Sequence, residues 1–151
     1  MATFRVQQVS HDDAHVAIHD VRQSVFVQEQ GIAAELERDA LDPVCAHELA
    51  LDADGQPVGT GRLAPDGRIG RMAVLASLRN QGVGEALLDA LVEAGRTLGL
   101  AEVHLHAQLP ARAFYARQGF LPEGAVFEEA GIGHQQMRRR LGEASALASR
   151  A

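Results

Sequence analysis

The sequence predicts an α/β (α+β) fold, in which one domain combines a sheet with several helices. The 151 residues, 46% apolar and 23% charged, have the length and composition of one globular domain. Strand and helix patterns follow one another in the order βα(α)βββαβαββ, without an internal repeat or a linker. We therefore assign residues 1–141 to a single domain and residues 142–151 to a short, frayed tail.

The N-terminal part is predicted to contain one strand and two helices. Residues 4–9 alternate as a half-buried strand does, and Ser10 caps the following helix together with Asp13. That helix ends at Gln30-Gly31, and residues 33–43 are expected to form a short second helix. The acidic side chains of this second segment are predicted to form a solvated face: Glu35, Glu37, Asp39 and Asp42.

The remaining elements alternate between strands and helices. Strands at 45–52 and 57–64 enclose an Asp-Gly turn, which predicts a hairpin. A strand at 69–75 leads into a helix whose leucines repeat at helical spacing until Gly99. A strand at 101–107, a helix at 110–118 and two strands near 122–129 and 134–140 complete the domain, with Pro110 and Gly119 at the ends of that helix.

The run Arg79-Asn80-Gln81-Gly82-Val83-Gly84 lies between a strand and a helix and predicts an anion site. A helix start has free N–H groups and a positive dipole end, and glycine lets that backbone approach a phosphate closely. Arg79 adds a cation. The chain contains no lysine, which excludes a P-loop, and Leu87 stands where a Rossmann fingerprint needs its third glycine. The loop therefore predicts a site for the pyrophosphate of a nucleotide-type cofactor.

A second motif narrows the choice of cofactor. Gln108, Ala111, Phe114 and Tyr115 follow the strand 101–107 and precede Gly119-Phe120. The two motifs, in this order and spacing, resemble those of the GNAT acetyltransferases. Further stretches resemble the ElaA-like branch of that family, and the likeness covers residues 4–140. These stretches are residues 25–30, 59–63, 106–108 and 127–134.

The resemblance implies a GNAT fold, that is, a mixed, mostly antiparallel twisted sheet of six to seven strands with helices on both faces. Its central strands, here 69–75 and 101–107, splay apart and admit acetyl-CoA as co-substrate. The residues implied to hold acetyl-CoA are Met72, Ala73 and Val74 through their backbone, the loop residues Arg79, Asn80, Gln81, Gly82, Val83 and Gly84, and Gln108. The implied activity is N-acetyl transfer to a primary amine by direct attack on the thioester. Tyr115, the only tyrosine, is then the general acid to the CoA thiolate.

The general base stays open among several residues. An amine with a pKa of about 10 is mostly protonated at pH 7, so some group must accept a proton. In addition to Tyr115, the catalytic candidates are Glu29 and His134, and Glu128, Glu129 and His106 remain further candidates for the base. Arg62 either binds an acidic group or pairs with a neighbouring carboxylate. As a hypothesis, the acidic face at residues 35–42 would favour a cationic acceptor.

Bulk properties limit the partners. The formal net charge of −6 argues against nucleic acid, and the longest apolar runs are too short to span a membrane. The lone Cys45 excludes an internal disulfide, and the first residues show no secretion signal. We expect a cytoplasmic protein whose partner is a small-molecule amine, with no nucleic acid, membrane or metal. A homodimer is compatible with the family, whose members are often dimers.

Three other interpretations stay open. His104 and His106 lie on one face of a strand, and with His134 they would offer ligands to a metal enzyme, although the anion loop would then have no role. A GNAT fold could also bind acyl-CoA as a regulatory module without turnover. Finally, the donor could carry an acyl chain longer than acetyl.

Overall fold

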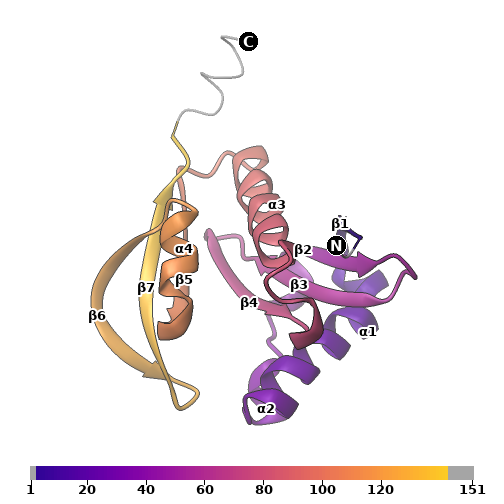
Figure 1. Ribbon diagram of the computed structural model, residues 1–151. Helices are drawn as coiled ribbons and strands as arrows, with labels where there is room; N and C mark the ends of the chain where they lie inside the picture. Colours follow the sequence, from indigo (N-terminus) through magenta and orange to yellow (C-terminus); the bar gives the residue numbers. More distant parts are fainter. Residues whose placement is uncertain (1–2, 143–151) are drawn as a thin grey trace.

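The computed structural model describes residues 3–142 and contains one seven-stranded sheet in the order β1-β2-β3-β4-β5-β7-β6 (Figure 1). The strands are β1 (Phe4–Val9), β2 (Ala46–Asp52), β3 (Pro57–Leu63), β4 (Arg68–Val74), β5 (Glu102–Gln108), β6 (Leu121–Glu129) and β7 (Ile132–Arg140). Every neighbouring pair is antiparallel except β4–β5, which is parallel. This confirms the predicted mixed, mostly antiparallel sheet. Residues 143–151 of the predicted tail lie outside the described residues.

Helices cover both faces of the sheet, as predicted. They are α1 (His11–Arg22), α2 (Ala34–Glu37), α3 (Val83–Thr97) and α4 (Arg112–Arg117). Leu49 and Leu51 of β2 pack against Ile18 of α1, whereas Ala50 between them packs with Leu87 of α3. Because successive side chains of a strand point to opposite faces, α1 and α3 lie on opposite sides of the sheet. No helix of residues 3–142 is long and apolar enough to cross a membrane.

The first helix differs from its prediction in one respect. Ser10 caps α1 as expected, since its Oγ accepts a hydrogen bond from the Asp13 N–H at 3.1 Å. The helix then continues to the predicted end, but as a π-helix, η1 (Gln23–Glu29), in which the Gln30 N–H donates to the Val25 carbonyl. Segments of π-helix occur often at functional sites. Here η1 brings the end of the helix to the part of the sheet where β4 and β5 separate.

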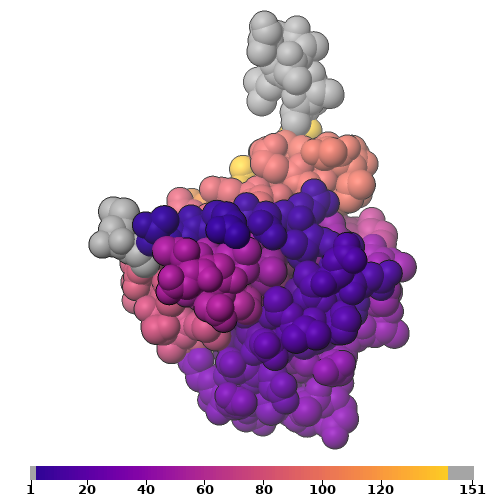
Figure 2. Space-filling model, turned by 90° about the vertical axis from the view of Figure 1, so that its right-hand side faces the viewer, coloured from indigo at the N-terminus to yellow at the C-terminus, as the bar shows by residue number. Residues whose placement is uncertain are grey.

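The second helical segment is shorter than predicted. Only α2 and a 3₁₀ turn, η2 (Asp42–Val44), form within residues 33–44. Two further 3₁₀ turns precede α3 and α4, respectively: η3 (Ala76–Leu78) and η4 (Leu109–Ala111). The N-terminal segments, indigo to purple, cover much of the face seen in Figure 2.

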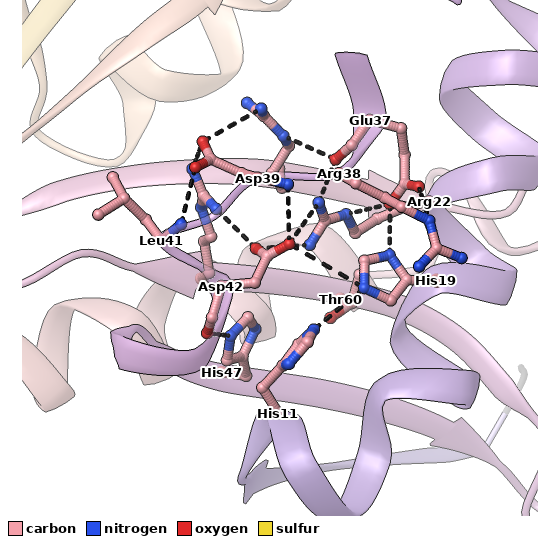
Figure 3. Close-up of polar contacts among 12 residues, drawn as sticks. His11, His19, Arg22, Glu37, Arg38, Asp39, Leu41, Asp42, His47 and Thr60 are labelled. Atoms are coloured by element: carbon pink, nitrogen blue, oxygen red, sulfur yellow. Dashed lines mark hydrogen bonds and ion pairs between the residues drawn. The ribbon is translucent and has the colours of Figure 1, made fainter. Parts of the chain in front are cut away.

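The predicted solvated face of residues 35–42 is wrong for Glu37 and Asp42, which are only 4% and 2% exposed. The fully buried Arg22 of α1 binds the Asp42 carboxylate, with Nη1 and Oδ1 3.0 Å apart, and Arg62 of β3 binds the same oxygen at 2.6 Å (Figure 3). A buried guanidinium requires a charged partner, and these carboxylates provide it. Arg62 therefore pairs with neighbouring acids, one of its two predicted alternatives.

This buried network fixes the segment that carries Glu37. The Glu37 carboxylate accepts a hydrogen bond from His19 Nδ1 at 2.7 Å, and its Oε1 lies 2.7 Å from Arg22 Nε. Burial alone would raise the pKa of Asp42, but the hydrogen bonds and charges of Arg22 and Arg62 lower it to about 2. Residues 34–44 are thus held against the sheet by ion pairs, close to the separation of β4 and β5.

Candidate active site

β4 and β5 pair at only two positions before they diverge. Arg68 pairs with His104 and Ile69 with Leu105, yet β4 continues to Val74 and β5 to Gln108. A cavity of about 380 Å³ opens where the strands separate, and Figure 1 shows the divergence. Its lining includes η1, the α2 segment, both strands, α4 and the β6–β7 hairpin. The central splay implied by the resemblance is therefore present.

Of the three β4 residues predicted to bind the donor through backbone, Val74 has a backbone that the strand pairing directs away from β3. The Leu75 N–H donates to the Val58 carbonyl, so Val74, paired with Gly59, directs its own N–H and C=O away from β3. Because this orientation alternates along a strand, the backbone of Ala73 faces β3, and Ala73 is less suited than Val74. Met72 lines the cavity.

The predicted anion loop has the local geometry of a helix start with free donors. Gly82 is the N-cap of α3 with φ +89°, a conformation that favours glycine, and Asn80 also has positive φ. The first bond of the helix runs from the Ala86 N–H to the Gly82 carbonyl, so the three N–H groups before it, at residues 83–85, are available. Val83 is buried and anchors the turn, and the Gln81 side chain donates to the Ser77 carbonyl.

Arg79 is already paired with Glu29 in this structure. Its Nη1 and Nη2 lie 2.5 and 2.6 Å from the two Glu29 oxygens, and its Nε donates to the Val74 carbonyl at 3.0 Å. The hydrogen bond from Arg79 lowers the pKa of Glu29 below its ordinary value. Glu29 is outside the cavity lining, and a carboxylate held in this way is a weaker proton acceptor. Its role as a base remains a prediction without support from its position.

Tyr115 lies in the cavity wall on α4. Its ring packs edge-on against Phe114 and Phe120, with centroids 5.1 and 6.0 Å away. Within residues 3–142 its hydroxyl has no hydrogen-bond partner. Burial raises the pKa of Tyr115 to about 12, so the phenol stays protonated at neutral pH and offers a free donor.

Three polar side chains of β5 and the β6–β7 hairpin also line the cavity. His134 Nδ1 lies 2.6 Å from the Ile132 carbonyl, to which it must donate a proton, so in the neutral imidazole the lone pair is on Nε2. That Nε2 is 3.9 Å from Glu129, whose other oxygen lies 3.1 Å from His106 Nδ1. Burial would raise the pKa of Glu129, but the His106 hydrogen bond and nearby positive charges outweigh it and lower the pKa. Glu128, in contrast, is exposed and outside the cavity lining.

The sequence analysis did not predict the side-chain partner of Gln108. Its side-chain amide exchanges two hydrogen bonds with Gln30, at 3.2 and 3.1 Å, and thereby joins the end of η1 to the end of β5. Arg68 and Arg71 also line the cavity and were not singled out. Gln30 belongs to a stretch that resembles the family, whereas Arg71 lies inside the predicted strand 69–75, Arg68 just before it, and neither belongs to a motif.

The histidines considered for a metal do not converge. In the described part of the chain, His11, His19 and Asp42 bring their ligand atoms within 4.8 Å of one another, but His104, His106 and His134 form no such group. The Asp42 carboxylate of that trio is already compensated by Arg22 and Arg62. His106 pairs with Glu129, which gives it a hydrogen-bonding role instead.

Comparison with known proteins gives a consistent result. The acetyltransferase (GNAT) domain family matches residues 3–141. YjcF of Bacillus subtilis, described as an uncharacterized N-acetyltransferase, is 37% identical over 123 residues, which is 79% of this chain and 87% of the relative. An acyl-CoA N-acyltransferase of Pseudomonas aeruginosa is 33% identical and superposes with a TM-score of 0.80, covering 91% of this chain and 99% of its own. ElaA of Escherichia coli, at 28% identity, also reaches a TM-score of 0.80, with coverages of 91% and 100%.

Proposed function

This chain belongs to the GNAT acetyltransferase family and to its ElaA-like branch, and on that premise we propose that it is an acetyl-CoA-dependent N-acetyltransferase. The acceptor is a primary amine whose nitrogen attacks the thioester carbonyl directly. The observation that carries the proposal is the unpaired stretch of β4 and β5, which opens the cavity next to Tyr115. β4 then leads from this cavity to the start of α3.

The donor binds along β4. Its pyrophosphate accepts hydrogen bonds from the N–H groups at residues 83–85, where the helix dipole adds positive potential. The amides of its pantetheine arm pair with the backbone of Met72 and Val74, as an added strand does. Arg79 exchanges Glu29 for the pyrophosphate, and Gln108 exchanges Gln30 for an amide of the pantetheine or for a water molecule.

Each group around the reacting atoms has one task. The amine nitrogen forms a bond to the thioester carbonyl carbon, the C–S bond breaks, and the amine proton passes to His134 Nε2, directly or through water. The departing thiolate accepts a hydrogen bond from Tyr115. A phenol of pKa about 12 lies about 3.5 units above a thiol of pKa about 8.5, so full transfer of its proton would be uphill by about 5 kcal/mol. Tyr115 therefore acts mainly as a hydrogen-bond donor, and solvent protonates the released CoA.

Acetyl-CoA binding by calorimetry tests the donor site. Gly82→Asp places a negative charge at the N-cap of α3, and Gly55→Asp is its matched control in the β2–β3 turn. Both glycines have positive φ, +89° and +78°, and a Cβ added at either meets no atom within 4 Å. The two variants should therefore fold equally well and differ only in where the charge lies.

Binding by the wild type and by Gly55→Asp, with a loss of 100-fold or more in Gly82→Asp, is the expected result. The amine screen then follows, with thiol release as the readout. Absence of binding by the folded wild type would refute the proposal. Binding without turnover of any amine would instead support an acyl-CoA-binding module.

A further inference from the structure

Arg71 enters the cavity from an irregular point of β4. The register of β3 and β4 shifts between Thr60 and Arg62, so that β4 holds one extra residue opposite Gly61. Arg71 occupies this bulge with φ +51°, a left-handed conformation that is unfavourable for a residue with a side chain. Bulges beside functional sites re-aim a side chain. This one leaves the Arg71 guanidinium in the cavity lining.

The charge of Arg71 is incompletely compensated by the protein. Its Nε and Nη2 donate to the carbonyls of Glu37 and Leu36 at 3.2 and 3.3 Å, and Nη2 reaches Asp39 at 3.4 Å. Asp39 already binds Arg62 more closely, at 2.9 Å. Within residues 3–142, Nη1 of Arg71 forms no hydrogen bond.

A comparison of Arg62 with Arg71 also indicates that the charge of Arg71 is incompletely compensated. Burial would lower the pKa of Arg62, but its hydrogen bonds to Asp39 and Asp42 outweigh burial and raise that pKa. For Arg71, burial lowers the pKa, and the positive charges of Arg62 and Arg22 lower it further, against weaker opposing contributions from Asp39 and Asp42. Around Arg71 the neighbouring positive charges thus outweigh the negative ones, beside a space that a ligand can enter.

The carboxylates of the same wall have no charge left for a cationic ligand. Glu37 faces Arg22 and His19, and Asp39 is shared by Arg62 and Arg71. The earlier hypothesis of a cationic acceptor rested on a solvated acidic face and loses its basis. Across the separation of the strands, the base His134 and the carboxylate of Glu129 line the same cavity.

We propose that the acceptor is an amino acid, with its amine toward His134 and its carboxylate bound by Arg71. This proposal rests on the proposed function. Because a hydrogen bond from the free Nη1 is stronger to a charged carboxylate than to a neutral carbonyl, the acid is preferred over its uncharged amide. The cavity of about 380 Å³ has the size of a small-ligand site. Its apolar walls, which include Phe26, Ile32 and Leu36, suit an apolar side chain.

The test compares L-leucine with L-leucinamide as acceptors, with thiol release as the readout. The amine of the amide is less basic and therefore more often neutral, so intrinsic reactivity favours the amide and a preference for the acid must come from the protein. The proteins are the wild type, Arg71→Asn, Arg71→Lys and, as control, Arg96→Asn in the last turn of α3, outside the cavity lining. Asparagine tolerates positive φ, so Arg71→Asn removes the charge at little conformational cost. Circular dichroism confirms that each variant is folded.

The wild type and Arg96→Asn should prefer the acid by at least about 10-fold in kcat/KM, the size of one charge-assisted hydrogen bond. Arg71→Asn should abolish this preference, and Arg71→Lys should retain part of it. An equal acid-to-amide ratio in the wild type and Arg71→Asn would overturn the inference while leaving the acetyltransferase proposal intact.

If neither acceptor is turned over, the binding of the two acetylated products tests the same inference. With CoA present, N-acetyl-L-leucine should bind the wild type at least about 10-fold more tightly than N-acetyl-L-leucinamide, and Arg71→Asn should bind both alike. Equal binding of the two by the wild type refutes the role of Arg71. Failure of the wild type to bind acetyl-CoA itself refutes the proposed function, and the inference falls with it.

Discussion

Asp42 is the carboxylate on which the buried network depends, and replacing it by asparagine gives a quantitative test. The side chain is 2% exposed and accepts hydrogen bonds from both Arg22 and Arg62. Asparagine has nearly the same shape and imitates the protonated, uncharged acid. The substitution therefore removes the charge and leaves two buried guanidinium groups without their common partner.

The magnitude follows from the pKa of Asp42, which falls from 3.8 to about 2. A difference of about 1.8 units corresponds to about 2.4 kcal/mol of stability at pH 7. Because the folded-state pKa is depressed, this contribution is complete above pH 3.8 and is lost as pH falls through 2. Linkage gives about 1.3 kcal/mol at pH 3 and about 0.4 kcal/mol at pH 2. Breaking a buried ion pair commonly costs about 3–5 kcal/mol, so 2.4 kcal/mol is a lower bound at pH 7.

Urea unfolding at pH 7 and pH 3 measures both quantities. The control is Asp54→Asn, because Asp54 is exposed in the β2–β3 turn and its replacement should change stability by less than about 0.5 kcal/mol. Asp42→Asn should lose at least about 2.4 kcal/mol at pH 7 and about 1 kcal/mol less than that at pH 3. Equal midpoints for the two variants at pH 7, or a deficit that grows as pH falls, would refute the ion-pair description.

Three further outcomes follow from the site. Tyr115→Phe should lower kcat by about 100-fold without changing acetyl-CoA affinity by calorimetry. In the pH–rate profile of the wild type, the rate should not fall below pH 10.5, because the Tyr115 pKa is about 12. A fall in rate near pH 10 that is absent from the phenylalanine variant would contradict that pKa. Glu29→Gln should leave kcat within about twofold, since Glu29 serves Arg79 in an exposed pair; a 100-fold loss with intact donor binding would reinstate it as the base. Gln30→Ala and Gln108→Ala should each destabilise by about 1 kcal/mol in urea unfolding, and the double variant by less than their sum; strict additivity would mean that the amide pair is absent in solution.

Most of the fold could be predicted because its signals are local. The Ser10 cap, the Asp52–Gln56 turn and the leucine spacing of α3 each depend on residues close in sequence, and all three elements form where expected. The π-helical end of α1 was missed because its hydrophobic positions differ little from those of an α-helix. The extent of α2 was overestimated for a different reason, since tertiary ion pairs determine the conformation of that segment.

The site was also predicted only in part, because local motifs could be recognised and contacts between distant segments could not. The anion loop and Tyr115 lie in contiguous motifs, and their placement beside the separated strands agrees with the resemblance. The partners that determine their state come from distant segments: Glu29 lies 50 residues from Arg79, and Gln30 lies 78 residues from Gln108. The burial of Glu37 and Asp42 likewise depends on Arg22 and Arg62. No spacing rule along one sequence reveals such pairs.

The separation of β4 and β5 also divides the chain into two contiguous halves. Strands β1 to β4 with α1 and α3 come from residues 4–97, and strands β5 to β7 with α4 come from residues 102–140. Since only two residue pairs join β4 to β5, the halves adhere chiefly through side chains, where Leu88 and Leu91 of α3 meet Val103 and Leu105 of β5. The distance between hydrogen-bonded strands is set by the backbone and does not depend on the side chains. The distance across an apolar contact, in contrast, changes with the size of the side chains in it. Substitutions in the apolar core can therefore adjust the width of the opening between β4 and β5 without any change in topology.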